Sequence, residues 1–136
     1  AFDHFDFSKA LKISLANYLE NEFTDDNKVG WYLDELGQFN LHSLSEVTRT
    51  MSFWINVYNG FTNYQIISNQ LKNSVWEMPD FFSNRGLQIE DLFFSLDDIE
   101  HGILRRNGKR RNGKPLQFKT DDPKMKLMVD NFDEEL

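Results

Sequence analysis

Glu46–Leu71 reads EVTRTMSFWINVYNGFTNYQIISNQL, and this stretch decides how the chain folds. Its apolar side chains recur at steps of three and four residues, which is the periodicity of a helix and not the alternation of a strand. The members of this band are Val47, Met51, Trp54, Ile55, Tyr58, Phe61 and Tyr64, with Ile67 and Leu71 extending it. Val57 and Ile66 fall outside the band, so the helix is apolar around much of its circumference. Because such helices lie inside a domain, we predict one long buried central helix around which the other elements pack.

A polar stripe interrupts this helix. Ser52, Asn56, Asn59 and Asn63 are spaced four, three and four residues apart, which places them on one face. Asparagine is a mediocre helix former, and a buried amide is costly unless it is hydrogen-bonded. Either these side chains cap and bridge neighbouring loops, or they line a site and orient a catalytic group. We expect the stripe to face the helix that contains His101, with an Asn56 or Asn59 side chain within hydrogen-bonding reach of the Glu100–His101 segment.

Length and composition indicate a globular protein. The 136 residues suit a single domain, 1–136, and a chain of this size buries roughly two-thirds of its unfolded surface. Thirteen Phe, three Trp and four Tyr argue against disorder. The formal net charge of −7 disfavours non-specific binding to nucleic acid or to an anionic membrane. No apolar run approaches the ~20 residues of a transmembrane helix.

The chain contains no cysteine, which excludes disulfides, thiolate metal sites and a cysteine nucleophile within these residues. The three histidines, His4, His42 and His101, lack metal-ligand spacing. The sequence also has no phosphate loop, dinucleotide fingerprint or Gly-x-Ser-x-Gly elbow, so we predict no metal and no cofactor. No signal peptide is visible, and we expect a soluble protein that is cytoplasmic, or exported if a leader was removed before Ala1.

The segments before the central helix are predicted as one longer helix and one short helical turn. Ser8 suits the N-cap of a helix over Lys9–Glu22. Thr24–Gly30 reads as a turn, and Trp31–Leu36 as a helical turn closed by a glycine. We expect Ser43 or Ser45 to cap the central helix.

After the central helix, Pro79 excludes a continuing helix. The turn signal Asn84-Arg85-Gly86 separates Phe81–Ser83 from Leu87–Ile89. This pattern predicts a small hairpin whose second strand continues through Leu92–Phe94. The predicted fold class is therefore mostly α with a minor β element (α+β).

His101 is the histidine with the most suggestive surroundings. Ser95 is expected to cap a helix that runs to about Arg106, with acidic residues in its first turn. Glu100 precedes His101, and a histidine near a carboxylate suits a general base. Adjacent residues on a helix point about 100° apart, however, which hinders a shared role for this pair. His101 is therefore either catalytic or a structural residue with satisfied hydrogen bonds.

A basic segment follows this helix. Residues 105–114 read RRNGKRRNGK, a tandem copy of one five-residue unit in which six of ten residues are basic. We predict a basic loop over residues 105–120 that is either an extended surface loop or a clamp for an anionic ligand or an acidic partner, beginning with Arg105. Beyond it, Pro115–Thr120 is predicted as a strand and Lys124–Phe132 as a last helix.

Two motifs resemble a known family. SFWINVYNGFTNYQII (Ser52–Ile67) is similar to the Phe-Trp-Ile-Asn-x-Tyr-Asn signature of the domain-of-unknown-function 547 family. SLDDIEHGILR (Ser95–Arg105) is similar to its Ser-Leu-Asp-Asp-Ile-Glu-His-x-Ile-Leu-Arg signature, and DDPKMKL near the end also fits. The resemblance implies a helical front half followed by β structure, and kinship with papain-like or transglutaminase-like folds that use a Cys/His pair. By that analogy His101 is the base, with Glu100 and Asn59 as supports.

The resemblance also implies that part of the family pattern is missing. In the family, a segment shaped like Asp-Pro-Arg-Ile-His-Phe-Ala-Leu-Asn-Cys-Gly follows the position of Leu136, and its cysteine and histidine have no counterpart here. We therefore expect an incomplete family domain, the front part of a cysteine-dependent hydrolase or acyltransferase that is inactive by itself. An incomplete core exposes apolar surface, so we also expect self-association.

The alternative is a non-catalytic interaction module that binds a protein partner or an anionic ligand. Its contact surface is then the Trp/Asn face of the central helix together with the basic loop. The residues of this predicted binding set are Ser52, Trp54, Asn56, Asn63 and Arg105.

Overall fold

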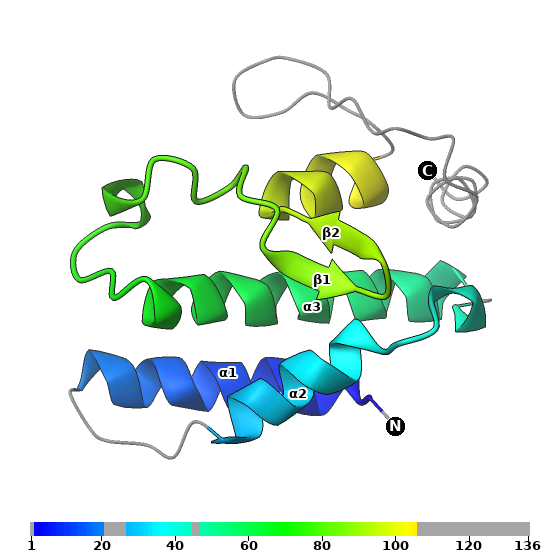
Figure 1. Ribbon diagram of the computed structural model, residues 1–136, viewed down its shortest axis with the longest axis horizontal. Coiled ribbons are helices and arrows are strands. Elements are labelled where there is room, and N and C mark those ends of the chain that lie inside the picture. Colours follow the sequence, from blue (N-terminus) through cyan, green and yellow to red (C-terminus); the bar gives the residue numbers. More distant parts are fainter. Residues whose placement is uncertain (1, 21–26, 45–46, 106–136) are drawn as a thin grey trace.

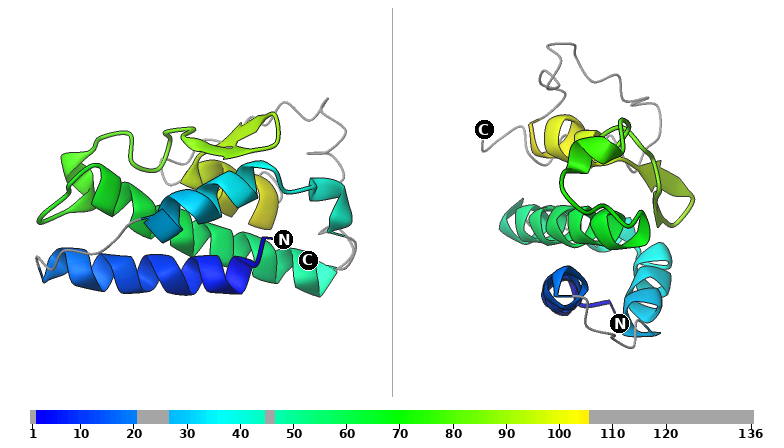
Figure 2. Two further views of the ribbon diagram at one scale, coloured as in Figure 1. Left: turned by 60° about the horizontal axis from the view of Figure 1, so that its bottom comes forward. Right: turned by 90° about the vertical axis from the view of Figure 1, so that its left-hand side faces the viewer.

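The central helix is the middle layer of the structure. The computed structural model describes residues 2–20, 27–44 and 47–105. Helix α3 (Val47–Ser68) lies between α1 (His4–Leu19) and α2 (Asn27–Gly37) on one side and a β-hairpin with the helical segment η3 (Asp98–Leu104) on the other (Figures 1 and 2). The predicted fold class, mostly helical with a small β element, is confirmed. The predicted central helix over Glu46–Leu71 is confirmed to within a few residues at its end.

Helix α1 lies parallel to α3 and close to it. Phe7 near the start of α1 faces Gly60, and Tyr18 near its end donates a hydrogen bond of 2.9 Å to the carbonyl oxygen of Leu71. A Cβ atom added at Gly60 would lie 2.7 Å from Cδ2 and 2.9 Å from Cζ of Phe7. Since the Phe7 ring is fully buried, only glycine at position 60 permits this close approach.

The start of α1 differs from the prediction. The N-cap is Asp3, whose Oδ1 accepts hydrogen bonds from the backbone N–H groups of Phe5 (2.9 Å) and Asp6 (3.1 Å). Ser8, predicted as the cap, lies inside the helix. The physical reason is that Phe7 is buried against α3, so packing extends the helix toward its N-terminus until the next good cap.

Helix α2 is longer than predicted. It begins at Asn27, so residues 27–30, which read as a turn, are helical. The buried side chains of Val29 and Leu36 are seven residues apart and lie on the face of α2 that joins the core. Tertiary burial therefore overrides the local turn signal around Gly30.

The hairpin exists, but its turn is elsewhere. Strands β1 (Leu87–Ile89) and β2 (Leu92–Phe94) pair antiparallel, with Ile89 opposite Leu92. The turn is therefore formed by Glu90 and Asp91, not by Asn84-Arg85-Gly86, and Phe81–Ser83 is not a strand. Glu90 has a left-handed φ of 56° and is held by tertiary bonds, since its N–H donates to the carbonyl of Gly37 at 2.7 Å.

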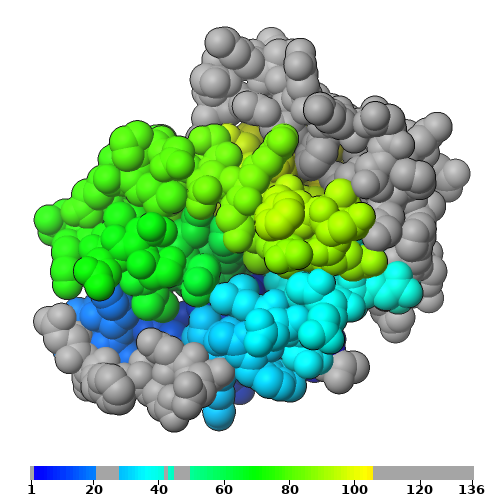
Figure 3. Space-filling view, viewed as in Figure 1, coloured from blue at the N-terminus to red at the C-terminus, as the bar shows by residue number. Residues whose placement is uncertain are grey.

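Loop 72–86, with the short helix η2 (Val75–Glu77), connects the C-terminal end of α3 to the hairpin. It lies beside the hairpin on the surface seen in Figure 3. Gln65 of α3 anchors this loop. Its Nε2 donates to the carbonyl of Phe81 at 2.8 Å, and its Oε1 accepts from Asn84 Nδ2 at 3.2 Å. This side chain is 2% exposed, and both ends of its amide are satisfied.

Several predictions fall at the edges of the described ranges. The segment before α3 contains the short helix η1 (Leu41–Ser43), where Ser43 Oγ donates to the carbonyl of Asn40 at 2.7 Å instead of capping α3. The alternative cap, Ser45, lies outside the described residues. The predicted basic loop beyond Arg105, the strand 115–120 and the helix 124–132 also lie outside them.

Candidate functional site

The motif SLDDIEHGILR folds into an anchored helical segment. Ser95 and Asp98 bond reciprocally: Asp98 N–H donates to Ser95 Oγ at 3.0 Å, and Ser95 N–H donates to Asp98 Oδ2 at 2.9 Å. The predicted cap at Ser95 is thus confirmed. Arg85 makes a bidentate interaction with the carboxylate of Asp98: Nε donates to Oδ2 at 2.9 Å, and Nη2 donates to Oδ1 at 3.2 Å.

The segment η3 itself is a π-helix over Asp98–Leu104 and not the α-helix that its cap predicts. π-helices are rare and occur frequently at functional sites. His101 and Gly102 lie in the middle of this segment, and both are buried. The fold therefore places the motif histidine in an unusual backbone conformation at the interface with α3.

His101 is surrounded by carboxylates but has no hydrogen bond. Its side chain is 2% exposed, and its Nε2 lies 3.5 Å from Glu100 Oε2 and 3.9 Å from Asp97 Oδ1. Neither Nδ1 nor Nε2 has a hydrogen-bond partner. A buried polar group without a partner costs about 1–3 kcal/mol. Both carboxylates lie on the Nε2 side, so a proton on Nε2 leaves Nδ1 as the basic atom of the ring.

Glu100 is held by a residue of the central helix. Tyr58 Oη donates a hydrogen bond of 3.0 Å to Glu100 Oε1, while Oε2 is the oxygen near His101. The Glu100 side chain is 29% exposed, so this carboxylate is partly accessible to solvent. Tyr58, Glu100 and His101 thus lie in sequence from α3 into η3, linked by one hydrogen bond and one approach of 3.5 Å.

The polar stripe of α3 does not face η3 as one unit. Asn56 contacts α1, where its Nδ2 lies 2.9 Å from Nδ1 of His4, and Asn59 is exposed to solvent. The expected hydrogen bond from Asn56 or Asn59 to the Glu100–His101 segment is therefore wrong, because Asn56 points to the opposite neighbour. Tyr58 makes the contact that the sequence assigned to an asparagine.

The remaining predicted binding residues are dispersed. Trp54 is fully buried, with its ring centroid 5.2 Å from that of Phe94, and its Nε1 has no hydrogen-bond partner. Ser52 and Asn63 are half-buried, and Arg105 is exposed at the end of η3. The buried Trp54 therefore belongs to the core and does not contribute an exposed binding face.

Sequence reasoning missed Tyr58, Gln65 and Asp97. Tyr58 and Gln65 did carry a signal, because a hydroxyl or an amide inside an apolar helix requires a partner when buried. Asp97 was assigned only to the first turn of a helix, whereas in the structure it lies near the histidine four residues later.

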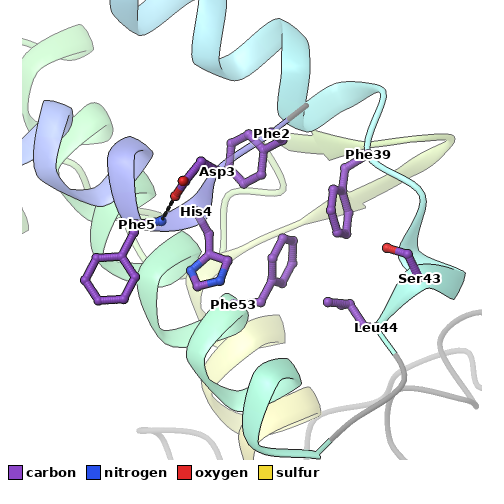
Figure 4. A pocket seen from close by; sticks show the side chains of 8 residues that line it. All are labelled: Phe2, Asp3, His4, Phe5, Phe39, Ser43, Leu44 and Phe53. Atoms are coloured by element: carbon purple, nitrogen blue, oxygen red, sulfur yellow. Dashed lines mark hydrogen bonds between the residues drawn. The ribbon is translucent and has the colours of Figure 1, made fainter.

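A pocket of about 700 Å³ opens beside the start of α1 (Figure 4). Phe2, Phe39 and Phe53 gather along it with His4, while Phe5 points away from the other three phenylalanines. Asp3 lies at its edge, and its carboxylate is engaged in capping α1. No reactive pair of groups lines this pocket, so we assign the candidate chemistry to His101.

Two further observations concern the described residues as a set. Within the ranges 2–20, 27–44 and 47–105, no group of three or more His, Cys, Asp or Glu side chains is arranged to hold a metal ion. No helix in that same part of the chain is long and apolar enough to span a membrane.

Comparison with known families identifies the region that contains the site. The model of a family described as "Protein of unknown function, DUF547" matches residues 41–136. The chain belongs to this family. The DUF547 match includes α3, the hairpin and η3, and therefore Tyr58, Glu100 and His101, whereas α1 and α2 precede it. No curated protein and no solved structure matches the chain.

Proposed function

We propose that this DUF547 domain provides the general base of a cysteine-dependent hydrolase or acyltransferase, with His101 as the base and Glu100 as its orienting carboxylate. The observation that supports this most directly is the buried His101 ring, whose Nε2 lies 3.5 Å from Glu100 Oε2 and whose two nitrogens have no hydrogen-bond partner. An unpaired buried imidazole costs stability, and such costs are typical of functional residues.

The proposed reaction begins with a thiol. His101 Nδ1 accepts the proton of the thiol, and the thiolate attacks the carbonyl carbon of an acyl substrate. The leaving group departs with the proton that Nδ1 returns, so that the acyl group ends on sulfur. Glu100 accepts a hydrogen bond from the Nε2–H of the imidazolium.

The thiol has to come from outside these residues, because none of the 136 is cysteine. By itself the domain is then inactive toward acyl substrates. The ring is also only 2% exposed, so an approaching thiol requires η3 to open or shift. Kinship with papain-like or transglutaminase-like folds is part of this proposal, since those folds pair a histidine with a cysteine nucleophile.

The test supplies the missing thiol as a small molecule. Acyl transfer from p-nitrophenyl acetate to 2-mercaptoethanol is measured with the wild-type domain, with His101→Met and with His4→Gln as the control histidine. General-base catalysis is typically worth about 10²–10⁴-fold, so the domain should accelerate transfer and His101→Met should abolish that acceleration. Equal rates for the wild type and His101→Met would contradict the proposal.

A binding module without chemistry is the second candidate, and exposed apolar side chains favour it. Trp76 is 63% exposed, Phe5 70%, Leu19 61% and Trp31 53%. Such side chains suit contact with a protein surface, including a second copy of this chain. Sedimentation at increasing concentration tests this: Trp76→Ser and Phe5→Ser should weaken self-association, and a monomer at all concentrations would contradict self-association.

A further inference from the structure

We propose that the pocket between α2 and the hairpin binds a guanidinium group, the charged end of an arginine side chain. The pocket has a volume of about 380 Å³, which is within the range of small-ligand sites. Figures 1 and 3 show α2 and the hairpin side by side on one face of the molecule. Tyr58, Glu100 and His101 are not among the residues that line this pocket, so the inference is independent of the proposed function.

Asp34 gives the pocket its charge. It lies in the last turn of α2, and its exposed carboxylate makes no hydrogen bond or ion pair within the part of the chain that the structure describes. The C-terminal end of a helix dipole is negative, so a carboxylate is unfavourable there, and no basic side chain in that turn offsets it. Of the described residues that line the pocket, Asp34 alone carries a charge. The pocket therefore attracts a cation and repels an anion.

The hairpin side of the pocket presents hydrogen-bond acceptors. Gln88 Nε2 donates to the carbonyl of Glu90 at 3.0 Å, which fixes this amide and leaves its Oε1 as an acceptor. The main-chain carbonyl oxygen of Gln88 lies 3.8 Å from the position that a Cβ atom on Gly37 would occupy, so it faces α2. A guanidinium group has five N–H donors and no acceptor. It therefore complements a pocket that combines a carboxylate with carbonyl oxygens.

The α3 side of the pocket suits the rest of an arginine side chain. Phe61 and Tyr64 stack with ring centroids 6.4 Å apart and an interplanar angle of 21°. Phe61 and Leu87 are buried, and Tyr64 is half-buried. Arginine packs its aliphatic stem on apolar surface and its planar guanidinium on aromatic rings. The ammonium of lysine is more strongly hydrated and cannot pair with a carboxylate through two parallel N–H groups, so arginine fits this pocket better.

The experiment titrates the whole ¹⁵N-labelled chain with the blocked tripeptide acetyl-Ala-Arg-Ala-amide. Saturable shifts are expected at the backbone amides of Gly37, Gly86 and Gln88, which line the pocket. A second tripeptide carries citrulline, which keeps the shape of the arginine side chain but has no charge. Replacing arginine by citrulline, or Asp34 by asparagine (Asp34→Asn), should weaken binding by about five-fold, the effect of losing one exposed ion pair.

A control variant and a second ligand complete the test. Asp80→Asn removes the same charge from an exposed position outside the pocket and should leave the affinity unchanged. Equal affinities for the arginine and citrulline peptides, or equal losses in Asp80→Asn and Asp34→Asn, would overturn the proposal, as would the absence of saturable shifts. Free arginine distinguishes two sources of the guanidinium group. Tighter binding of the tripeptide supports a side chain of a partner protein, and tighter binding of free arginine supports a small-molecule ligand.

Discussion

Two buried polar side chains lie where α3 meets its neighbours, and the two regions are built differently. Gln65 is 2% exposed, and its amide bonds to the carbonyl of Phe81 and to the amide of Asn84. His101 is also 2% exposed, and neither of its ring nitrogens has a hydrogen-bond partner. In the region of Gln65, the buried amide has its hydrogen-bond partners, as is usual for buried polar groups. The second region buries an imidazole whose ring nitrogens make no hydrogen bond, which supports the functional role proposed for His101.

The largest expected effect concerns a contact that serves packing alone, between α1 and α3. Gly60→Ala places a Cβ against the fully buried Phe7 ring and should lower the free energy of unfolding by about 3 kcal/mol, the upper range of overpacking costs. The control is Gly30→Ala on α2, where an added Cβ meets nothing within 4 Å. That variant should gain up to about 1 kcal/mol from helix propensity. Denaturant unfolding of both variants checks the pair, and similar responses would contradict this account of the packing.

The second-largest expected effect concerns Asp98, which anchors the start of η3. Asp98 is 1% exposed and bonds to Arg85 and Ser95, so Asp98→Ala should lower the free energy of unfolding by about 2 kcal/mol. Asp80→Ala, at an exposed loop position, should change it by less than about 0.5 kcal/mol. If Asp98→Ala were neutral in thermal or denaturant unfolding, η3 would not be anchored as described.

The smallest expected effect is the pH dependence of stability that Glu77, in loop 72–86, contributes. The backbone N–H of Lys72, foremost, and those of Asn73 and Ser74 lower the pKa of Glu77 from its ordinary value of 4.5. The folded-state pKa is depressed, so the stabilisation is present above pH 4.5 and is lost as the pH falls through the lowered value. Glu77→Gln should therefore make stability less dependent on pH in that acidic window. Identical acid-unfolding curves for the variant and the wild type would exclude this contribution.

The sequence predicted the elements whose signals are local or strongly periodic. The nine-member apolar band predicted α3, and the Ser95 cap and the acidic turn predicted the start of η3. Prediction from the sequence failed where tertiary contacts determine the local structure. Asn84-Arg85-Gly86 is the better turn signal, yet the hairpin turns at Glu90, whose N–H bonds to Gly37 and whose Oε1 accepts from Leu41 N–H.

The candidate site was also predictable only where its signal is local in the sequence. His101 and Glu100 could be proposed from the sequence because a histidine beside a carboxylate is visible in one motif. Their partner on α3 was misassigned, since periodicity puts the asparagines on one stripe but does not say which neighbour the stripe faces. Asn56 faces His4 of α1, and Tyr58, counted among the apolar residues, faces Glu100.

The central claim is that His101 is retained for function and Gln65 for structure, and one matched pair of variants tests it. Gln65→Met and His101→Met replace two equally buried polar side chains by the same flexible apolar one, and urea unfolding gives the free energy of each. Gln65→Met should lose about 1–3 kcal/mol, because the carbonyl of Phe81 and the amide of Asn84 lose their partner. His101→Met should stay within about 0.5 kcal/mol of the wild type or become more stable. A loss in His101→Met as large as that in Gln65→Met would show that His101 is a structural residue.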